Sequence, residues 1–242
     1  QTECDPLPFD EMLAALDEEF GGRRTEIFAA IDSKPLGSAS LAQVHRAVLA
    51  SGESVAIKIQ RPGVKATMAL DIDIMRMLAR RASRYMKGEQ MLDLRAVVEE
   101  MWATFLEETD FRREAANLAE FAELNRDCAF VACPKVYTEL CSEYVLVMEY
   151  VDGIPIGDAD QLVANGYDLE EIGSKMLDNY ATQILDHGFF HADPHPGNVI
   201  IRDGRIVYID LGNMGRLSAR DRAGFGDIIE AVGLKDPGAL KD

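Results

Sequence analysis

The sequence is poor in the features that mark secreted, membrane-spanning and nucleic-acid-binding proteins. It has four cysteines in 242 residues, without a CxxC pair or a metal-ligand spacing with histidine, so we expect the reduced thiols of a cytoplasmic protein. It contains no signal-peptide pattern and no apolar run of roughly 18 to 20 residues, the length of a transmembrane helix. Positive charge is also scarce, because 25 Lys and Arg against 42 Asp and Glu give a net charge of −17. This acidity argues against a nucleic-acid partner and against unaided binding to anionic lipid.

The composition is otherwise that of an ordinary globular protein, with 48% hydrophobic and 28% charged residues and enough length to bury a core. The segment Val151–Pro155 contains both Gly and Pro, so we expect the chain to divide there into an N-terminal region, residues 1–151, and a C-terminal region, residues 152–242. The sequence starts at Gln1 rather than Met, and we expect flanking segments that it does not include.

Two segments have the pattern of β-strands. Alternation over Ser54–Gln60 predicts a strand with Ala56 and Lys58 on one face and three aliphatic residues on the other. The nearly all-apolar segment Tyr144–Tyr150 predicts a strand at the centre of a sheet.

Two further segments have the pattern of helices. Apolar residues spaced by four over Asp93–Asn125 predict a helix that bends near Thr109–Asp110. A second helix is expected from a capping sequence at Asp168 to a stop at Gly188.

The pair Asp203–Gly204 lies between two apolar runs and predicts a β-hairpin with a two-residue turn. Pairing outward from this turn places Asn198 opposite Ile209, so Asn198 and Asp210 lie at the open end of the hairpin. Asp193 precedes Asn198 in the loop that enters it. Carboxylate and amide oxygens converging there are suitable ligands for a hard cation such as Mg²⁺. The alternative is that these residues only form and cap turns.

The spacing of these residues is similar to that of protein kinases. Asp193 and Asn198, followed by Asp210–Gly212, have the spacing of the kinase catalytic loop and its metal-binding DFG segment. Upstream, Val55–Lys58 reproduces the kinase strand whose lysine contacts ATP phosphates. A lone strand lysine is more often a solvated edge residue, but the downstream motifs favour the functional interpretation.

Three longer motifs resemble one family in particular, the ABC1/UbiB atypical kinases, also called the ADCK or coenzyme Q8-like group. Pro35–His45 resembles its alanine-rich nucleotide loop, Glu108–Glu114 its ExD motif with the Lys-pairing glutamate, and His191–Asn198 its catalytic loop. The resemblance runs from about Leu7 to Leu217. It implies an α+β, two-lobed protein-kinase-like fold, with a small antiparallel-sheet N-lobe carrying helical insertions and a mostly helical C-lobe.

The resemblance also implies roles for individual residues, with ATP and Mg²⁺ or Mn²⁺ as ligands. The expected catalytic residues are Lys58, Glu114 and Asp193. The expected metal ligands are Asn198 and Asp210. The expected nucleotide-binding residues are Gly37, Ser38, Ala39, Ser40, Ala56, Lys58, Glu149 and Val151. Ser and Ala are bulkier than the kinase glycines, so we expect a stiffer nucleotide loop.

Four other residues have open or structural interpretations. The resemblance makes Glu108 and Asp110 a regulatory element that contacts a family-specific segment over the active site, whereas the alternative is a solvated helix face or a helix cap. His195 is expected to be structural in its Pro-His-Pro-Gly turn, and His45 to pack beneath the nucleotide loop.

The short segment after Asp210 constrains the substrate. Only Asn213–Leu217 separate the DLG segment from a capped helix start at Ser218, which leaves no long activation segment for a protein substrate. The resemblance implies phosphoryl transfer or ATP hydrolysis linked to ubiquinone or isoprenoid-lipid metabolism. It also implies membrane association at the inner face through segments outside this chain. The alternatives are a non-catalytic ATP-binding regulatory module (a pseudokinase) and a small-molecule phosphotransferase of the aminoglycoside/choline kinase type.

Overall fold

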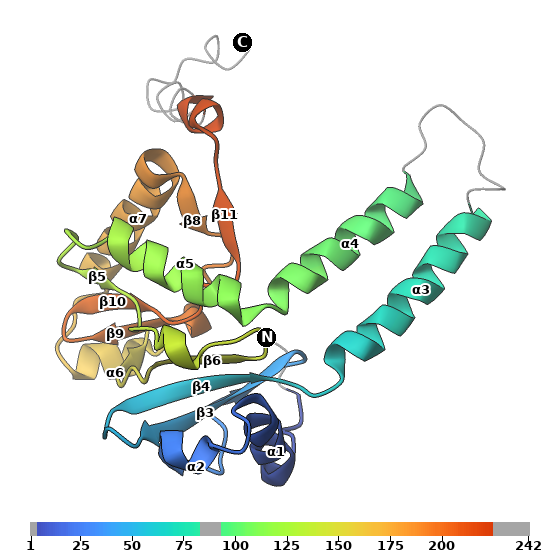
Figure 1. Ribbon diagram of the computed structural model, residues 1–242. Helices are drawn as coiled ribbons and strands as arrows, with labels where there is room; N and C mark the ends of the chain where they lie inside the picture. The colour runs from blue at the N-terminus through green and yellow to red at the C-terminus, as the bar shows by residue number, and fades with distance from the viewer. Residues whose placement is uncertain (1–3, 83–92, 225–242) are drawn as a thin grey trace. The chain divides into compact units, whose positions relative to one another are not determined.

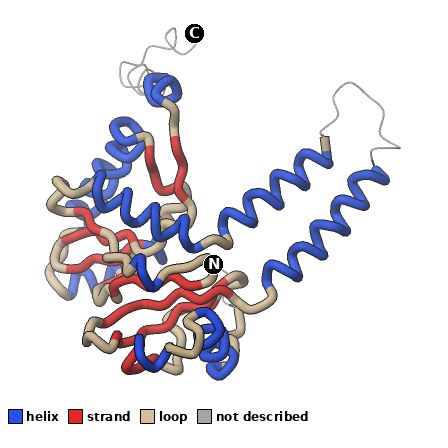
Figure 2. The backbone as a smooth tube through the Cα atoms, viewed as in Figure 1, coloured by secondary structure: helices blue, strands red, loops and turns tan. Residues whose placement is uncertain are grey.

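The computed structural model describes residues 4–82 and 93–224, and the chain divides into two compact units (Figure 1). Unit 1 comprises Gln1–Ala115 and Val136–Tyr150, and unit 2 comprises Ala116–Lys135 and Val151–Asp242. Both combine helices with mainly antiparallel strands (Figure 2), which agrees with the expected α+β class.

Unit 1 is built on a five-stranded antiparallel sheet in the order β1-β3-β4-β6, with β2 paired to β3. The strands are β1 (Phe28–Ile31), β2 (Gly37–Ser38), β3 (Ala42–Leu49), β4 (Ser54–Gln60) and β6 (Val145–Glu149). The predicted strands 54–60 and 144–150 are therefore confirmed, the second one residue shorter at each end. The aliphatic face of β4 (Val55, Ile57 and Ile59) lies in the core of unit 1, as its alternation predicted.

The helix α1 (Phe9–Glu19) covers this aliphatic face through Met12 and Leu16, which are 1% and 0% exposed. Each such buried side chain contributes about 1.5 to 3 kcal/mol relative to an exposed one. The short helix α2 (Arg24–Ile27) and the 3-10 turn η1 (Thr138–Leu140) complete the small elements of the unit. One face of the sheet thus packs into the core of unit 1, and Lys58 lies on the opposite face.

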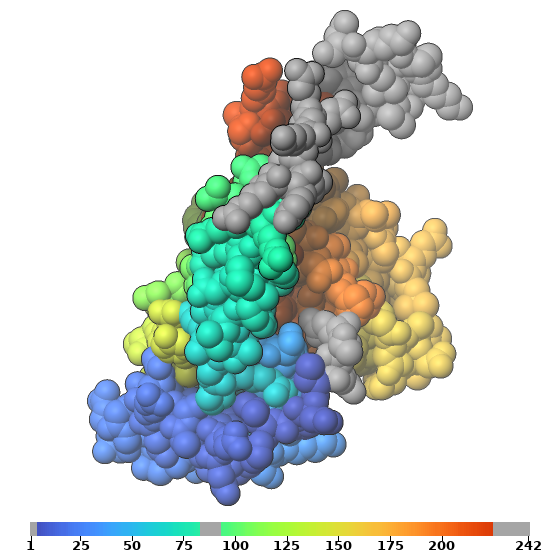
Figure 3. Space-filling view, turned by 90° about the vertical axis from the view of Figure 1, so that its right-hand side faces the viewer, coloured from blue at the N-terminus to red at the C-terminus, as the bar shows by residue number. Residues whose placement is uncertain are grey.

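Two long helices, α3 (Val64–Ala82) and α4 (Leu94–Glu108), run side by side and project from the sheet of unit 1 (Figures 1 and 2). Figure 3 shows α3, in teal, on the surface of the unit. Asp93 caps α4 by accepting hydrogen bonds from two backbone N–H groups of its first turn. The expected bend is a complete break, because the helix ends at Thr109 and α5 (Phe111–Leu124) begins after it.

Unit 2 contains a four-stranded sheet in the order β5-β10-β9-β7 and a two-stranded pair of β8 with β11. Its strands are β5 (Val131–Ala132), β7 (Ile154–Pro155), β8 (Phe189–His191), β9 (Val199–Arg202), β10 (Arg205–Tyr208) and β11 (Met214–Arg216). Its helical elements are α6 (Ala159–Ala164), α7 (Leu169–Thr182), the π-helical turn η2 (Gln183–His187) and the 3-10 turn η3 (Pro196–Asn198).

The predicted hairpin is confirmed in position, turn and register. Asp203 and Gly204 have φ of 52° and 75°, the two left-handed residues of a type I′ turn. Arg202 pairs with Arg205, and at the open end the N–H of Ile209 donates to the carbonyl of Asn198 at 2.9 Å.

The segment 116–135 belongs to unit 2, whereas the sequence led us to place it in the N-terminal region, residues 1–151. The reason is packing at two points. The ring of Phe121 meets that of Tyr208 edge-on at 5.2 Å between centroids, and β5 pairs in parallel with β10. A boundary read from turn residues cannot detect such pairing between distant segments.

The helix expected between Asp168 and Gly188 is capped and stopped as predicted. The Asp168 carboxylate accepts from the backbone N–H groups of Glu170 and Glu171, and Gly188 stops the chain in the left-handed region with φ 63°. Its last turn, however, is π-helical rather than α-helical. Such a turn often occurs at functional sites.

Candidate active site

The strand lysine of unit 1 forms the ion pair that the family resemblance implied. The Nζ atom of Lys58 lies 2.8 Å from Oε2 of Glu114 on α5, 56 residues further along the chain. Glu114 is 3% exposed and the Lys58 side chain 16%. Lys58 Nζ also lies 5.4 Å from the centre of the Phe111 ring. A charge pair this deeply buried is costly to desolvate, so its position is set by surrounding structure rather than by attraction alone.

The expected nucleotide loop is a tight hairpin. Gly37 and Ser38 pair with β3, and the N–H of Ala39 donates to the carbonyl of Ala42 at 2.9 Å, which leaves Ser40 inside the turn. The backbone is therefore held by hydrogen bonds on both sides of the turn. This agrees with the stiff loop expected from Ser and Ala in place of glycines.

Arg61 supports the same loop, although no sequence motif indicated it. Its guanidinium donates through Nε to the carbonyl of Ala39 at 2.8 Å and through Nη2 to Oγ of Ser38 at 2.7 Å. The only signal available in the sequence was a positive charge directly after β4. Arg61 thus places a second cation beside the loop, in an otherwise strongly acidic chain.

His45 lies beneath this loop, as expected. It is fully buried, its Nε2 is 2.7 Å from Nε2 of Gln43, and its Nδ1 is 2.7 Å from the carbonyl of Asp32. Burial lowers the pKa of His45, and the neighbouring Asp32 opposes this shift. Gln43 in turn lies 3.4 Å from Oγ of Ser38 and was also missed from the sequence.

The residues expected to meet the adenine lie on β4 and β6 and at the boundary after β6. Ala56 is 6% exposed and pairs with Met148, while Glu149 pairs with Val55 at the end of β6. Unit 1 ends at Tyr150 and unit 2 resumes at Val151. Of the expected nucleotide-binding residues, Glu149 therefore belongs to unit 1 and Val151 to unit 2.

In unit 2, the expected catalytic loop is organised by backbone hydrogen bonds. The N–H of Asp193 donates to Nδ1 of His191 at 3.2 Å, and the carbonyl of Asp193 accepts from the N–H of His195 at 2.7 Å. The side chain of Asp193 is exposed. His195 caps the following 3-10 turn, since its Nδ1 accepts from the N–H of Gly197 at 3.1 Å. His195 therefore has the structural role that was expected.

His191 occupies the position of the leading histidine of a kinase catalytic loop, and it is 1% exposed. Burial lowers its pKa, and the nearby Asp210 and Asp193 oppose that shift. A neutral ring fits its hydrogen bond, because Nδ1 must be unprotonated to accept from Asp193.

The donor set of unit 2 fits a magnesium ion. Asn198 is 7% exposed, and its Nδ2 donates to the carbonyl of Asp193 at 3.4 Å, so that Oδ1 is the atom of this amide suited to bind a metal. Asp210 follows β10, and its Oδ1 accepts from the N–H of Gly212 at 3.0 Å. A carboxylate and an amide oxygen are ligands that Mg²⁺ prefers, together with phosphate oxygens and water. The part of the chain that the structure describes contains no cluster of three His, Cys, Asp or Glu side chains suited to a metal.

The segment after Asp210 is short and firmly attached to unit 2. Within it β11 pairs with β8 from Met214 to Arg216, and Gly215 lies against the ring of Phe190, where an added Cβ would be 2.3 Å from a ring carbon. Arg216 forms a two-pronged ion pair with Glu120 at 2.7 and 2.5 Å. The Ser218 side chain then caps the next helical turn, as the sequence predicted.

The two residues of the ExD motif have different surroundings. Asp110 caps α5 by accepting from the N–H of Arg112 at 3.1 Å, and its carboxylate also binds the Arg112 guanidinium. These contacts lower the pKa of Asp110. Glu108 is exposed at the end of α4.

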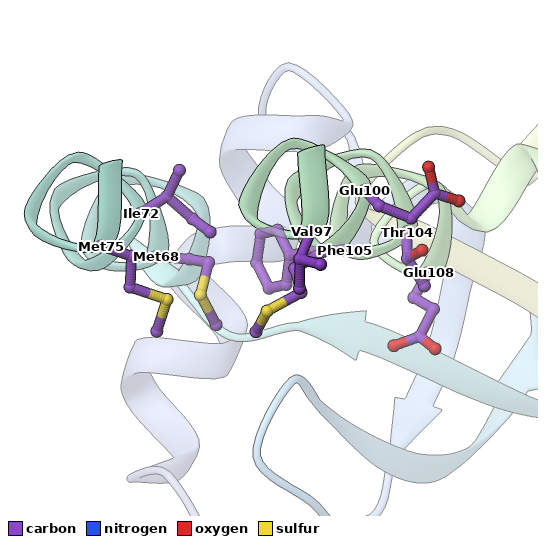
Figure 4. A pocket seen from close by; sticks show the side chains of 9 residues that line it. Met68, Ile72, Met75, Val97, Glu100, Thr104, Phe105 and Glu108 are labelled. Atoms are coloured by element: carbon purple, nitrogen blue, oxygen red, sulfur yellow. The ribbon is translucent and has the colours of Figure 1, made fainter. Parts of the chain in front are cut away.

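Glu108 lies at one end of an open groove of about 490 Å³ between α3 and α4, shown in Figure 4. Apolar side chains of both helices and three polar residues line this groove: Met68, Ile72, Met75, Val97, Glu100, Met101, Thr104, Phe105 and Glu108. Among the described residues, no helix combines the length and apolar character needed to cross a membrane.

Comparison with known proteins identifies relatives along nearly the whole chain. The chloroplastic protein ACTIVITY OF BC1 COMPLEX KINASE 8 of Arabidopsis thaliana is 38% identical over 242 residues, 98% of this chain and 32% of that protein. The probable protein kinase UbiB of Azotobacter vinelandii is 36% identical over 227 residues, 92% of this chain and 42% of that protein. The chain thus spans less than half the length of these curated relatives.

Solved structures identify the fold. The Rv3197–erythromycin complex from Mycobacterium tuberculosis superimposes with a TM-score of 0.79 at 27% identity, covering 98% of this chain and 59% of that one. A Rio2 kinase–ADP/Mg²⁺–phosphoaspartate complex from Chaetomium thermophilum gives a TM-score of 0.51 at 14% identity over 90% of this chain and 57% of that one. At that identity the second likeness shows a protein-kinase-like fold and nothing more.

The expected family and the expected fold class are therefore both confirmed. The family model described as the ABC1 atypical kinase-like domain matches residues 1–242. Because this match spans the chain and the relatives above agree with it, this chain belongs to the ABC1 atypical kinase-like family, which includes the UbiB and ACTIVITY OF BC1 COMPLEX KINASE proteins.

Proposed function

We propose that this chain binds ATP with Mg²⁺ and transfers or hydrolyses its terminal phosphate. The single observation that carries the proposal is the ion pair of Lys58 with Glu114 at 2.8 Å. A buried pair contributes little net stability compared with apolar residues of similar volume. The presence of Lys58 between Ile57 and Ile59 of β4 is therefore better explained by a ligand that needs a fixed cation, such as the phosphates of a nucleotide.

The proposed nucleotide contacts are the residues that the family resemblance implied. In unit 1, the Gly37–Ser40 loop covers the phosphates, although the N–H of Ala39 is already bonded to the carbonyl of Ala42. Lys58 neutralises the phosphates, and the backbone at Glu149 contacts the adenine beside Ala56. In unit 2, the backbone of Val151 completes the adenine contact. The loop hairpin and its Arg61 support favour this assignment, since anion binding by backbone N–H groups requires a preorganised loop.

Asn198 and Asp210 are the proposed ligands of Mg²⁺, with Mn²⁺ as a substitute. The metal supplies charge neutralisation of the phosphate oxygens during transfer. Asp193 is proposed to orient the attacking hydroxyl or water and to accept its proton. Its exposed side chain and doubly hydrogen-bonded backbone suit this role, because the carboxylate can reach a substrate while the loop stays fixed.

The proposed acceptor is a small molecule or an isoprenoid lipid, or water, rather than a protein. Within the described residues, the segment after Asp210 is short and is taken up by the pairing of β11 with β8, which disfavours a peptide substrate. The family resemblance favours a link to ubiquinone metabolism, and the related Rv3197 structure was solved as a complex with a small molecule, erythromycin. Membrane association is proposed only through segments outside this chain.

Glu108 and Asp110 are proposed to form a regulatory element that contacts a further segment of the polypeptide. The exposed carboxylate of Glu108 at the end of the α3–α4 groove favours this interpretation. The helix-capping contacts of Asp110 explain that residue without a partner, so the regulatory assignment depends mainly on Glu108.

The test is ADP release with Mg²⁺ by the 242-residue chain and by two variants, Asp193→Asn and Asp210→Asn. The matched control is Asp203→Asn, the same chemical change at the exposed hairpin tip, where Asn–Gly also favours a type I′ turn. We expect both site variants to lose at least about 100-fold in turnover, in line with the loss of a positioned charge in an active site. The control should match the wild type.

Equal turnover in all four proteins would contradict the catalytic assignment. Thermal stabilisation of the wild type by ATP and Mg²⁺ without ADP release would instead favour the non-catalytic ATP-binding module. In that case Asp210→Asn should still weaken the stabilisation, because it removes a proposed metal ligand.

A further inference from the structure

A chain of three buried amide side chains crosses the interior of unit 2. Asn125 follows the C-terminal end of α5, Asn179 lies on α7, and Gln183 begins the π-helical turn η2. They are 6%, 2% and 0% exposed, respectively. Buried amides are costly unless their donors and acceptors are hydrogen-bonded, so such a cluster requires a specific set of partners.

The three amides are joined by hydrogen bonds that all run in one direction. Nδ2 of Asn125 donates to the carbonyl of Phe121 at 3.0 Å, and Nδ2 of Asn179 donates to Oδ1 of Asn125 at 2.8 Å. Nε2 of Gln183 then donates to Oδ1 of Asn179 at 2.7 Å. Amides aligned head to tail polarise one another, which strengthens each bond of the chain.

The chain of amides ends on the strand that leads into the catalytic loop. Oε1 of Gln183 accepts the backbone N–H of His191 at 3.0 Å. The backbone carbonyl of His191 accepts a hydrogen bond from the hydroxyl of Tyr180 at 2.9 Å. Both backbone groups of His191 are thus held by side chains of α7 and η2, while its ring accepts the N–H of Asp193.

The π-helical turn explains why Gln183 can reach this strand. A π-turn inserts an extra residue into the helix and rotates the side chains around it. The phenol of Tyr208, whose pKa burial raises to about 12, lies beside Gln183. An apolar residue of similar size would fill the same space, so filling space does not account for an amide here.

We propose that Gln183, held in place by Asn179 and Asn125, is a positioning residue that fixes the Asp193 loop through the backbone of His191. The expected effect of Gln183 on kcat depends on the proposed phosphoryl chemistry. The expected effect of Gln183 on the order of residues 191–198 does not depend on that chemistry. The hydrogen bonds of Gln183 run to Asn179 and to the backbone of His191, so its proposed effect reaches Asp193 through the strand β8.

The experiment compares two substitutions of nearly equal size in the 242-residue chain. Gln183→Met removes both hydrogen bonds, whereas Gln183→Glu keeps an acceptor for the N–H of His191 and, when protonated, a donor for Asn179. Asn179→Leu tests the next link. The control for simple loss of packing is Leu162→Ala on α6, a fully buried residue of the same unit outside the network.

Two measurements are made on each protein: kcat and KM for ATP-dependent ADP release, and hydrogen exchange of the backbone over residues 189–198. Misplacement of a catalytic group by about 1 Å can cost about 100-fold, so we expect kcat of Gln183→Met to fall by about 10- to 100-fold. KM for ATP should change less than about twofold, since Lys58 and the nucleotide loop are untouched. Exchange over 189–198 should accelerate in Gln183→Met and Asn179→Leu, and Gln183→Glu should recover both properties in part.

The proposal is overturned if Leu162→Ala, at an equal loss of thermal stability, shows the same fall in kcat and the same exchange over 189–198. It is also overturned if Gln183→Glu performs no better than Gln183→Met. Absence of ADP release by the wild type would defeat the proposed function instead. The exchange comparison would then decide the positioning role by itself, so the two failures are distinguishable.

Discussion

The two units hold their functional side chains by different means. Unit 1 holds Lys58 with a charge, the buried carboxylate of Glu114, on a strand whose other face packs into an apolar core. Unit 2 holds the loop of Asp193 with neutral groups, namely the ring of His191 and the buried amides behind it. One unit thus depends on electrostatics and the other on hydrogen-bond geometry.

This difference teaches how each unit should respond to substitution. Removing one member of a buried ion pair leaves the other charge without compensation, which is expensive whatever the shape of the new residue. Removing one neutral amide leaves weaker dipoles unsatisfied, and the cost depends on geometry. Substitutions in the ion pair of unit 1 should therefore mainly lower the stability of the fold. Substitutions in the buried amides of unit 2 should mainly change the position of the Asp193 loop.

The largest effect is expected from breaking the charge pair of unit 1. Lys58→Met leaves the carboxylate of Glu114, 3% exposed, inside the protein, and we expect a loss of about 3 to 5 kcal/mol in the free energy of unfolding. Glu114→Gln should cost less, because Gln can still accept a hydrogen bond from Lys58 and Lys58 is the more exposed partner. Chemical denaturation measures both losses.

The double variant Lys58→Met/Glu114→Leu separates stability from function. Since apolar residues of similar volume can replace a buried ion pair at little cost, the double variant should regain most of the stability lost by Lys58→Met. It should nevertheless release no more ADP than Lys58→Met. Recovery of ADP release together with stability would show that the pair serves folding rather than phosphate binding.

A smaller effect is expected at the nucleotide loop of unit 1. Arg61→Ala removes the two hydrogen bonds to Ala39 and Ser38, each worth about 1.5 to 3 kcal/mol at most because the donor is charged. We expect KM for ATP to rise about 10-fold with a smaller change in kcat, measured by steady-state ADP release. Arg61→Lys keeps the charge but not the forked geometry, so it should recover only part of the loss. Full recovery by lysine would assign the effect to charge rather than to loop support.

Local features of both units could be predicted from the sequence because they depend on neighbouring residues. Alternation located β4 and placed Lys58 opposite the core face, and the Asp203–Gly204 turn fixed the register that brings Asn198 opposite Ile209. The sequence also located a bend near Thr109–Asp110, where the structure has a complete break between α4 and α5. In each case the residues that determine the feature lie close together in the sequence.

Features that join distant segments could not be derived from local patterns. The partner of Lys58 lies 56 residues away and came only from the family resemblance. The amide pair Asn125–Asn179 joins residues 54 apart, and each is an ordinary polar helix residue by sequence. The same limitation explains why 116–135 was placed in the wrong region of the chain. Such contacts depend on tertiary packing, and the spacing of residues along a single sequence does not reveal them.

The smallest effect concerns pH, and it compares the buried histidines of the two units. Burial lowers the pKa of His45 in unit 1 and of His191 in unit 2 below the ordinary value of 6.5. As pH falls below 6.5, the unfolded chain takes up protons that the folded chain does not, so stability must decrease. Above that pH neither group contributes a slope. The shift in melting temperature between pH 6.5 and 5.5 should be no more than about 2 to 4 °C, the size that about 1 kcal/mol produces in a chain of this length.

His45→Gln should flatten this dependence, because Gln cannot titrate but can still hydrogen-bond to Gln43 and to the carbonyl of Asp32. His195→Gln is the matched control at an exposed site and should keep the pH dependence of the wild type.

The carboxylates whose pKa is lowered in the fold, such as Asp110 and Glu120, have ordinary pKa values of 3.8 and 4.5. They lose their contribution to stability at lower pH. The change in stability between pH 6.5 and 5.5 is therefore assigned to the histidines rather than to these carboxylates. An unchanged slope in His45→Gln would mean that the pH sensitivity belongs to His191, and hence to the neutral network of unit 2 alone.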